Sequence, residues 1–537
     1  MSAPGTVSGS EESVLSAGVR EGVDHAIEQK LPGRLWDKDA TLWSGDENVQ
    51  RAIEGRLGWL DVPDWSLEHL KEMTDFADDI RKDVEWVVIL GMGGSSLCVE
   101  TLRDTFGSKS GYPKLLVLDS THPDQVRAIE RAVDLKKTMF IVSSKSGTTL
   151  EPQCYFEYFW NKMETVAHDR RLCFAAITDR GTPLEKMGVE YGFRRVFGNP
   201  PDIGGRYSVL SYFGMVPAAL AGIDIEAVLS SAASEAGLSK AEDERNMALT
   251  FGFFLGNGAC EGRDKLTIVT PPELRSFGYW AEQLIAESTG KSAKGILPIE
   301  GEAPASQEEE ANKRLYAHLT LADSSMEESE RRKVAHIELH LRDRSDIGAQ
   351  FFRWEFATAV AGHLIGINPF DEPNVAESKA KTNEVLSGYD ASRPLGQPND
   401  FGNPFERGTI DEFLTKNVRP DGYIAVMAYW ERDEKSIAAL QKFREMLSAK
   451  YRVPVTVGFG PRFLHSTGQL HKGGMPTGAF IQFVDTPNED LAIPGKPYSF
   501  GTLIRAQAIG DFETLKQHGR PVISFDIGTN GLETINA

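Results

Sequence analysis

Short apolar runs separated by longer mixed stretches recur along the chain, first between about residues 80 and 225. Glu85–Leu90 is followed by a glycine-rich turn, and Lys114–Asp119, Thr138–Ser143 and Leu172–Thr178 continue the pattern at helix-length intervals. Continuous apolar runs predict strands buried on both faces, and their alternation with helices is typical of a parallel sheet of βαβ units. The sequence therefore predicts a doubly wound α/β domain here.

A comparable pattern returns in the second half of the chain and predicts a second α/β domain. Its apolar runs are Lys265–Thr270, Gly422–Met427, Val453–Phe459, Gly478–Val484 and Pro521–Asp526. A long helix is predicted over Gln350–Ile365 between these strands. The Pro- and Gly-rich tract Asn383–Arg407 is predicted to be a surface excursion, and the Glu-rich Gln307–Arg314 a solvated helix face.

The predicted fold is thus α/β, with two doubly wound, mainly parallel sheets and flanking helices. We place a polar N-terminal segment at residues 1–30, a first domain at 31–240 and a second domain at 241–537. A chain of 537 residues with 41% hydrophobic content can bury cores of that size.

Net charge and cysteine spacing indicate which partners the protein can bind and in which compartment it is found. A net charge of −20 argues against binding to DNA, RNA or an anionic membrane, because the mean field repels polyanions. No apolar run approaches the roughly 18 to 20 residues of a membrane span, and Met1–Glu12 is small and polar, unlike a secretory signal. The four cysteines form no CxxC pair. We therefore expect a reducing, cytoplasmic location and no contact with nucleic acid or membrane.

Hydroxyl groups and small side chains gather directly after the strand predicted at Thr138–Ser143. The segment consists of Ser144, Lys145, Ser146, Gly147, Thr148 and Thr149, where the strand passes into a helix. Main-chain N–H groups at a helix N-terminus carry partial positive charge, and small residues let phosphate oxygens approach them. The loop predicts a phosphate site and hence a phosphorylated ligand.

A second turn, Gly91–Ser96, follows the preceding strand at the same predicted sheet edge, where open α/β sheets bind ligands. It lacks the third glycine of a dinucleotide fingerprint, because Ser96 stands in its place, and no Gly-Lys-Ser/Thr follows as in a Walker loop. Taken alone, the turn is equally well explained as a tight strand-to-helix connection. Together with the hydroxyl-rich loop it favours a site for a compact sugar phosphate.

Two further motifs supply charged groups that could act on such a ligand. Arg206 follows Gly204 and Gly205, where the backbone can bend to aim a guanidinium inward, although a structural ion pair explains it equally well. Gln283 and Glu287 lie four residues apart on one face of a predicted helix that ends near a glycine. A surface glutamate near a helix end is the simpler explanation of that spacing alone.

Histidines and a lysine in the second half complete the set of candidates. His465 and His471 lie in a glycine-flanked loop, and Lys379 lies about two helical turns after a turn. A metal site is the rival explanation for the two histidines. We disfavour it because no further ligand set has a recognisable spacing, and because His336 and His340 lie on a charged segment predicted to be helical. Neither a metal nor a cofactor is predicted.

Taken together, these motifs resemble those of the phosphoglucose isomerase family over about residues 30–537. The segments that carry the resemblance are Gly91–Ser96, Ser144–Thr149, Gly204–Ser208, Glu287–Lys291, Gly366–Asp371 through Lys379, and Leu464–Gln469. Within that family the sequence looks most like the isomerase half of bifunctional transaldolase/phosphoglucose isomerase proteins, and these 537 residues contain no transaldolase half.

The resemblance implies an activity and an assembly. The family interconverts glucose 6-phosphate and fructose 6-phosphate through a cis-enediol intermediate, without a cofactor. Its fold has two sugar-isomerase (SIS) type α/β domains, with the active site between them and usually completed by a second subunit. We therefore expect a homodimer and a possible functional link to a transaldolase.

The resemblance also assigns roles residue by residue. Glu287 matches the catalytic base, Arg206 the arginine that stabilises the enediolate, His465 the ring-opening histidine and Lys379 the lysine that closes the site. Substrate and phosphate contacts are expected from Gly94, Ser95, Ser144, Lys145, Ser146, Thr148, Thr149, Gln283 and Glu372.

The sequence departs from the family pattern in two places. In the usual order the histidine motif lies between the glutamate and the lysine, whereas here His465 follows Lys379, so its loop reaches the site by a different chain path. Glu372 also stands where the family commonly has glutamine, and this adds a carboxylate near the substrate.

Three alternatives to this isomerase remain open from sequence. A sugar-phosphate sensor of the same domain type would carry a DNA-binding or other output domain, and none is identifiable. An isomerase of broader specificity would also accept mannose 6-phosphate. An amide-transfer enzyme of the same class would need an N-terminal nucleophilic cysteine, but the first cysteine is Cys98.

Overall fold

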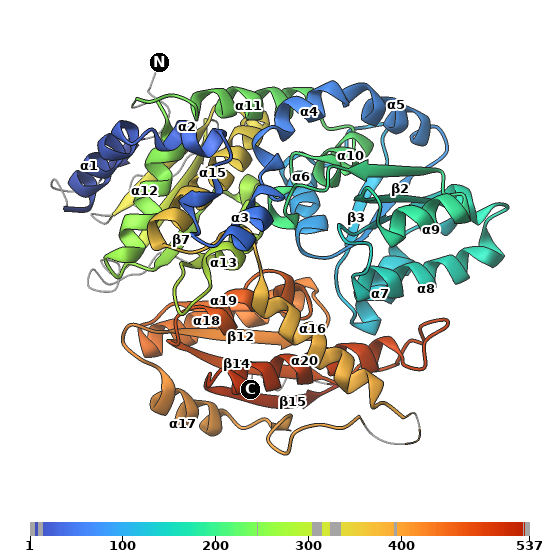
Figure 1. Cartoon of the computed structure of the whole chain (residues 1–537). Coiled ribbons are helices and arrows are strands. Elements are labelled where there is room, and N and C mark those ends of the chain that lie inside the picture. Colours follow the sequence, from blue (N-terminus) through green and yellow to red (C-terminus); the bar gives the residue numbers. More distant parts are fainter. Residues whose placement is uncertain are drawn as a thin grey trace.

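The computed structural model describes residues 6–8, 14–243, 245–302, 314–322, 335–390, 392, 395–529 and 531. In this part of the chain the strands form three five-stranded sheets with helices on their faces. Figure 1 shows the first two sheets side by side in the upper part of the molecule and the third sheet below them.

The first sheet is parallel throughout and has the order β3-β2-β4-β5-β6. Its strands are β2 (Trp86–Gly91), β3 (Lys114–Leu118), β4 (Thr138–Ser143), β5 (Phe174–Asp179) and β6 (Arg195–Asn199). Every residue of β4 is buried, as expected for a central strand covered on both faces. The four apolar runs of this region form strands within two residues of the predicted bounds.

The second sheet has the order β1-β10-β9-β7-β8. Its strands are β1 (Thr6–Ser8), β7 (Lys265–Val269), β8 (Leu297–Glu300), β9 (Leu315–Leu321) and β10 (His336–Leu341). All neighbours are parallel except β1, which pairs antiparallel with β10. The beginning of the described chain therefore joins a sheet whose other strands come from residues beyond 264.

The third sheet is parallel and has the order β11-β15-β14-β12-β13. Its strands are β11 (Asn403–Pro404), β12 (Tyr423–Tyr429), β13 (Val455–Phe459), β14 (Gly478–Asp485) and β15 (Val522–Gly528). The apolar runs predicted for the second half of the chain thus divide between two sheets, because β7 lies in the second sheet and the later runs in the third.

Helices connect most of the strands and cover the sheets (Figure 1). The α-helices are α1 (Val14–Glu28), α2 (Leu31–Trp36), α3 (Glu47–Glu54), α4 (Val62–Glu68), α5 (Leu70–Ile80), α6 (Leu97–Phe106), α7 (Pro123–Ala132), α8 (Leu150–Val166), α9 (Pro183–Tyr191), α10 (Tyr212–Leu220), α11 (Ile225–Leu238), α12 (Met247–Cys260), α13 (Phe277–Thr289), α15 (Ile347–Ile365), α16 (Pro373–Ser387), α17 (Arg407–Asn417), α18 (Glu434–Tyr451), α19 (Gly468–Gly473) and α20 (Phe500–Gln517). Short 3-10 turns are η1 (Ala40–Leu42), η2 (Gly58–Leu60), η3 (Gly93–Ser95), η4 (Leu135–Lys137), η5 (Arg170–Cys173), η6 (Gly205–Tyr207), η7 (Pro272–Leu274), η9 (Arg344–Asp346) and η10 (Arg462–His465).

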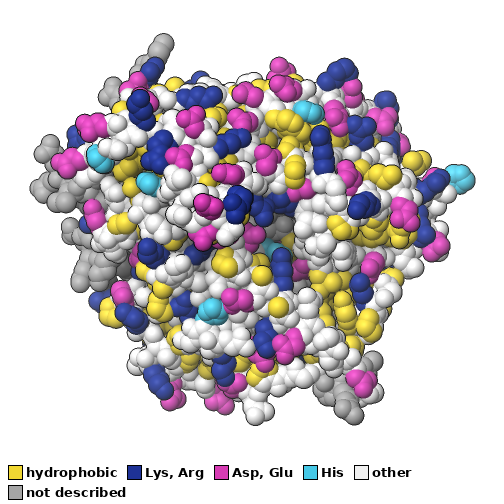
Figure 2. All heavy atoms as spheres, in the orientation of Figure 1, with side chains coloured by type: hydrophobic (Ala, Val, Ile, Leu, Met, Phe, Trp, Pro, Cys, Tyr) yellow, Lys and Arg dark blue, Asp and Glu magenta, His cyan; other side chains and the backbone are white. Residues whose placement is uncertain are grey.

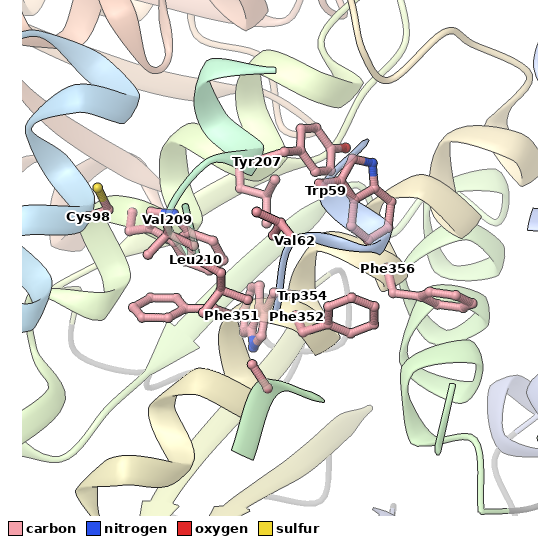
Figure 3. Close-up of a cluster of buried hydrophobic side chains, with 14 of the residues drawn as sticks. Trp59, Val62, Cys98, Tyr207, Val209, Leu210, Phe351, Phe352, Trp354 and Phe356 are labelled. Carbon is pink, nitrogen blue, oxygen red and sulfur yellow. The ribbon is translucent and has the colours of Figure 1, made fainter. Parts of the chain in front are cut away.

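One continuous hydrophobic core joins the first two sheets. It includes residues of β2 and β7 together with the long helix α15, which is buried along most of its length. Figure 3 shows part of this core, where Trp59 and Tyr207 lie near Phe352 and Trp354 of α15. The Trp59 ring centroid lies 5.3 Å from that of Tyr207 and 5.7 Å from that of Phe352. This packing fixes the turn that contains Arg206.

The third sheet is joined to the first by α20, whose side chains share a core with α8. The Phe500 ring centroid lies 6.2 Å from that of Tyr155 and 5.9 Å from that of Tyr158. Helix α16 follows α15 after the left-handed Gly366 and lies across the junction in Figure 1. Side chains from the first and third sheets therefore pack against each other at the junction, and this packing fixes their relative positions.

One secondary-structure prediction is wrong, and another lies mostly outside the described residues. His336 and His340 lie on strand β10, not on a helix, because the segment alternates polar residues with the buried Ile337, Leu339 and Leu341. Of the predicted helix face over residues 307–314, only Arg314 is described. The predicted surface excursion begins within α16, which continues to Ser387.

Candidate active site

The hydroxyl-rich loop connects β4 to α8 at the carboxyl end of the first sheet. Within it, Ser144 Oγ donates to Thr149 Oγ1 at 3.1 Å and accepts from the Gly147 N–H at 3.2 Å. Ser146 Oγ accepts from the Thr148 N–H at 3.2 Å. These contacts hold the loop in a compact turn whose hydroxyl groups at Ser146 and Thr148 are exposed.

The backbone of the loop requires glycine and leaves a helix N-terminus open. Gly147 has φ +66°, and a Cβ placed there would lie 2.8 Å from Leu184. Thr149 is the N-cap residue of α8 but its side chain caps no N–H group. The Thr149 hydroxyl therefore does not compete with an anion for the first-turn N–H groups of this 17-residue helix.

A cavity of about 140 Å³ opens at this loop. Its polar lining comes from four segments that are far apart in the sequence: the hydroxyl-rich loop and the start of α8, the α16 helix, the η10 turn and α20. The lining side chains that can form hydrogen bonds with a ligand or exchange a proton with it are Ser146, Thr148, Thr149, Glu151, Lys379, His465 and Gln507. Figure 2 shows a hollow near the middle of the molecular face, with Lys and Arg side chains close to it.

Arg206 is held in place by groups on two sides of the junction. Its Nε donates to Ser288 Oγ at 2.7 Å, and Nη2 donates to the carbonyl oxygens of Pro369 at 2.7 Å and Asp371 at 3.0 Å. Nη1 donates to Glu372 Oε2 at 3.0 Å. Only 3% of Arg206 is exposed, so this fixed cation is shielded from water.

The turn Gly91–Ser96 contacts the turn that contains Arg206, and the contact is made at Gly94. A Cβ on Gly94 would lie 2.0 Å from the Gly205 carbonyl oxygen, which is a backbone atom that cannot give way cheaply. Because Gly94 has no Cβ, η3 packs directly on η6, and Arg206 follows at the next position. The glycine-rich turn thus packs against the backbone of Gly205 and Arg206.

Glu287 lies near the end of α13, and its carboxylate faces Arg206. Its Oε2 lies 3.8 Å from Arg206 Nη1 and accepts from Gln283 Nε2 at 3.1 Å. Burial raises the pKa of Glu287, and Arg206 opposes this while Glu372 adds to it. A buried carboxylate with a raised pKa beside a fixed cation can accept and return a proton.

His465 is connected to both sides of this arrangement. Its carbonyl oxygen accepts from Gln283 Nε2 at 2.8 Å, and its Nε2 lies 3.1 Å from Glu151 Oε1. Burial alone would raise the pKa of Glu151, but the pKa is lowered because His465, and more weakly Lys379, favour the ionised form. Glu151 also accepts from Gln507 Nε2 at 2.7 Å. A single amide, Gln283, therefore bridges the predicted base and the predicted ring-opening histidine.

Arg206, Gln283, Glu287 and Glu372 do not line this cavity, and neither do several other predicted residues. Ser144 is buried within the loop, and Ser95 is buried in η3. The Lys145 ammonium pairs with Asp179 and donates to the Pro201 carbonyl oxygen at 3.2 Å. His471 is 3% exposed and packs among aromatic rings, where burial lowers its pKa well below the usual value. Of the two loop histidines, His465 is the one at the cavity.

Sequence reasoning missed two residues that hold His465. Glu151 stands two positions after the hydroxyl-rich loop, and a carboxylate in the first turn of that helix was the available signal. Gln507 lies on α20, and Thr121 Oγ1 donates to its Oε1 at 2.7 Å. No local pattern marks Gln507, because its partners come from residues more than 350 positions away.

The described residues hold no group of three or more His, Cys, Asp or Glu side chains that could bind a metal ion. Where the structure describes the chain, no helix is long and apolar enough to cross a membrane. The four cysteines are free thiols, of which Cys260 is exposed.

Comparison with known proteins finds that part of the chain is similar to phosphoglucose isomerases. The phosphoglucose isomerase family model matches residues 67–296, a range that contains the hydroxyl-rich loop, Arg206 and Glu287 and ends before Lys379 and His465. A probable glucose-6-phosphate isomerase of Methanococcus maripaludis is 29% identical over 422 residues, covering 68% of this chain and 94% of the relative. A glucose-6-phosphate isomerase of Staphylococcus saprophyticus is 28% identical over 380 residues, covering 60% of this chain and 85% of the relative.

Solved structures support the same α/β fold. A hypothetical protein from Thermus thermophilus superposes with a TM-score of 0.61 at 23% identity, covering 70% of this chain and 98% of that protein. A glucose-6-phosphate isomerase from Chlamydia trachomatis superposes with a TM-score of 0.55 at 19% identity, covering 78% of this chain and 92% of that one. The α/β prediction, with mainly parallel sheets and flanking helices, is confirmed.

Proposed function

We propose that this protein, which matches the phosphoglucose isomerase family over residues 67–296, interconverts glucose 6-phosphate and fructose 6-phosphate through a cis-enediol intermediate. The observation that carries the proposal is the convergence of Arg206, Gln283, Glu287 and His465 through contacts of 2.8 to 3.8 Å. These residues come from three separate parts of the chain. Their meeting beside a loop suited to phosphate supports one catalytic centre.

Glu287 transfers the proton between C2 and C1 in this mechanism. A carboxylate suits the task because burial raises its pKa toward the working range of a base. Arg206 offsets the negative charge that develops on the enediolate oxygen. Its guanidinium is already fixed by Ser288 and two carbonyl oxygens, so it needs no reorganisation when that charge appears.

His465 opens the sugar ring, assisted by Lys379. The ionised Glu151 carboxylate can only accept a hydrogen bond, so His465 Nε2 carries the proton that faces it. In the neutral ring this leaves Nδ1 as the nitrogen that exchanges a proton with the sugar. Lys379 is exposed on α16 and lines the same cavity, where its ammonium can reach a ligand.

The phosphate group binds the hydroxyl-rich loop. Ser146, Thr148 and Thr149 present hydroxyl groups at the cavity, and the uncapped N-terminus of α8 adds N–H donors. Gly94, Ser95, Ser144 and Lys145 belong to the same two turns, and we propose that they also contact the substrate or its phosphate. Glu372 accepts a hydrogen bond from Arg206, and we propose that it also contacts the substrate.

The direct test follows each substrate by NMR. Purified protein treated with a chelator is incubated separately with glucose 6-phosphate, fructose 6-phosphate and mannose 6-phosphate. Interconversion of the first two is expected, and its absence would refute the proposal. Appearance of mannose 6-phosphate would instead indicate the broader aldose-ketose specificity.

Replacing Glu287 tests the assignment of the base. Positioned acid-base groups typically contribute about 10²- to 10⁴-fold in rate, so Glu287→Gln should lose at least that much turnover while still binding sugar phosphate. Glu261→Gln, at an exposed glutamate outside the site, is the matched control. Near-normal turnover of Glu287→Gln would show that another group is the base.

The remaining parts of the proposal concern the cellular setting. We propose a cytoplasmic homodimer that acts in carbohydrate metabolism, with a functional link to a transaldolase as in the fusion proteins whose isomerase half this sequence resembles. Sedimentation of the purified protein tests the dimer. Addition of transaldolase to the isomerase assay, with fructose 6-phosphate as the shared metabolite, tests the link.

A further inference from the structure

His465 lies in a turn that follows a strand of the third sheet, whereas its partner Glu151 lies on a helix that follows a strand of the first sheet. The histidine lies in η10, directly after β13, and its ring must meet a carboxylate on α8. Side-chain contacts across the junction therefore have to set the position of η10. The first residue of η10, Arg462, has no role in the isomerase mechanism above.

We propose that Arg462 is a positioning residue that holds His465 at Glu151 through ion pairs with Asp119 and Glu100. The proposal rests on the proposed isomerase function, and it adds a residue that the family resemblance does not assign. It also explains how a histidine that follows Lys379 in the sequence reaches the site.

The geometry of a 3-10 turn couples the two side chains. Such a turn has three residues per turn, so side chains at positions i and i+3 eclipse each other. Arg462 and His465 are three residues apart within η10. Fixing the guanidinium therefore fixes the rotation of the turn about its axis, and with it the direction of the imidazole.

Two buried carboxylates of the first sheet region hold the guanidinium. Arg462 Nη1 donates to Asp119 Oδ2 at 2.6 Å, and Nη2 pairs with Glu100. Asp119 directly follows β3, and Glu100 lies on α6. Arg462 is 8% exposed, Asp119 7% and Glu100 3%. Both carboxylates therefore belong to the packed body of the protein, which gives the turn a rigid anchor.

The surrounding arginines determine the charge state of Glu100. Burial alone would raise the pKa of Glu100, but Arg432, Arg462 and Arg103 hold it well below its usual range. Glu100 is therefore ionised at neutral pH. Removing a partner from a buried, ionised carboxylate is costly, so the cluster resists displacement of Arg462.

A second arginine in the same cluster provides a natural comparison. Arg432 Nη2 lies 3.0 Å from Glu100 Oε1, and the guanidinium carbons of Arg432 and Arg462 each lie 5.4 Å from the centroid of the Tyr279 ring. Arg432 follows β12, however, and is not part of η10. It shares the electrostatic environment of Arg462 without sharing its connection to His465.

The expected effect follows from the precision that proton transfer requires. A misplacement of about 1 Å can cost about 100-fold in rate. Arg462→Met keeps the length and apolar stem of the side chain but removes both ion pairs. It should lower kcat on the cyclic sugar by about 10- to 100-fold, whereas KM changes little, because the phosphate loop is untouched.

The experiment compares Arg462→Met, Arg462→Lys and Arg432→Met. Turnover of glucose 6-phosphate is measured together with exchange of the C2 proton in its open-chain form, which depends on Glu287 and not on ring opening. We expect Arg462→Met to impair turnover much more than exchange, and Arg462→Lys to restore part of it through one ion pair. Arg432→Met also removes a partner of Glu100, so it should lower the thermal stability but keep nearly normal turnover. Thermal unfolding of each variant shows whether the fold is retained.

Several results would overturn the proposal. Normal turnover of Arg462→Met would show that His465 needs no anchor. Equal losses in Arg462→Met and Arg432→Met, or equal losses of turnover and exchange, would show a general weakening of the junction. A wild-type protein that isomerises neither sugar would refute the proposed function itself, which is a separate outcome.

Discussion

Replacing Glu372 with glutamine tests the electrostatics of the centre most sharply. Glu372 Oε2 and Glu287 Oε2 lie 3.0 Å and 3.8 Å from the same atom, Arg206 Nη1, so they are at most 6.8 Å apart. The negative charge of Glu372 contributes to the raised pKa of Glu287. Glu372→Gln removes that charge while its amide oxygen can still accept from Arg206.

The magnitude follows from Coulomb's law. Two unit charges about 7 Å apart repel each other by about 2 kcal/mol at an effective dielectric constant of about 20. The Glu372 side chain is 39% exposed, so solvent screening reduces the repulsion to about 1 kcal/mol. Since one pKa unit corresponds to about 1.4 kcal/mol, the pH dependence should shift by slightly less than one unit.

The assay is the pH profile of kcat/KM, which reports groups in the free enzyme. Removing a negative charge stabilises the ionised base, so the acidic limb should move to lower pH and activity below that limb should increase. Glu384→Gln, at an exposed position of α16, the helix that begins directly after Glu372, should leave the limb in place. An unchanged limb, or one displaced to higher pH, would refute the electrostatic coupling between Glu372 and Glu287.

Two further substitutions separate ring opening from phosphate binding. His465→Ala should impair conversion of the cyclic sugar more than C2 proton exchange on the open-chain form, because only ring opening needs the imidazole, and equal losses in the two assays would argue against that role. Thr149→Ala should chiefly raise KM in steady-state kinetics, because a hydroxyl contact with the phosphate, as proposed, would act in ground state and transition state alike. A large fall in kcat with unchanged KM would contradict the phosphate role.

Local sequence predicts the elements of the first sheet well because its strands are buried on both faces. A run such as Met139-Phe140-Ile141-Val142 has no helical period and is short, so it indicates a central strand without knowledge of its neighbours. The helix prediction for the alternating segment His336–Leu341 is wrong because it weighs the charged residues above the period of two. The predicted strands of the second half are present, but their division between two sheets depends on packing.

The candidate site shows the same contrast. Ser144–Thr149 can be singled out from local sequence because hydroxyl groups and a glycine follow a buried strand, whereas Glu287 is assigned only through the family resemblance. Glu151 and Gln507 escaped notice because they act only through contacts with His465 and with each other. The role proposed for Arg462 likewise depends on its ion pairs with carboxylates on the other side of the junction, which local sequence does not show.

The sequence by itself determined that the chain is α/β and where most of the strands buried on both faces lie, and it supplied the candidates for phosphate binding and proton transfer. These properties depend on the period of apolar residues and on the chemistry of single groups, both of which are local. Only the tertiary structure decided that His465, despite its place after Lys379, lies within hydrogen-bonding distance of Glu151 and beside Gln283. That outcome depends on how α20 packs on α8 and on buried ion pairs between distant segments, and neither leaves a periodic signal along the chain.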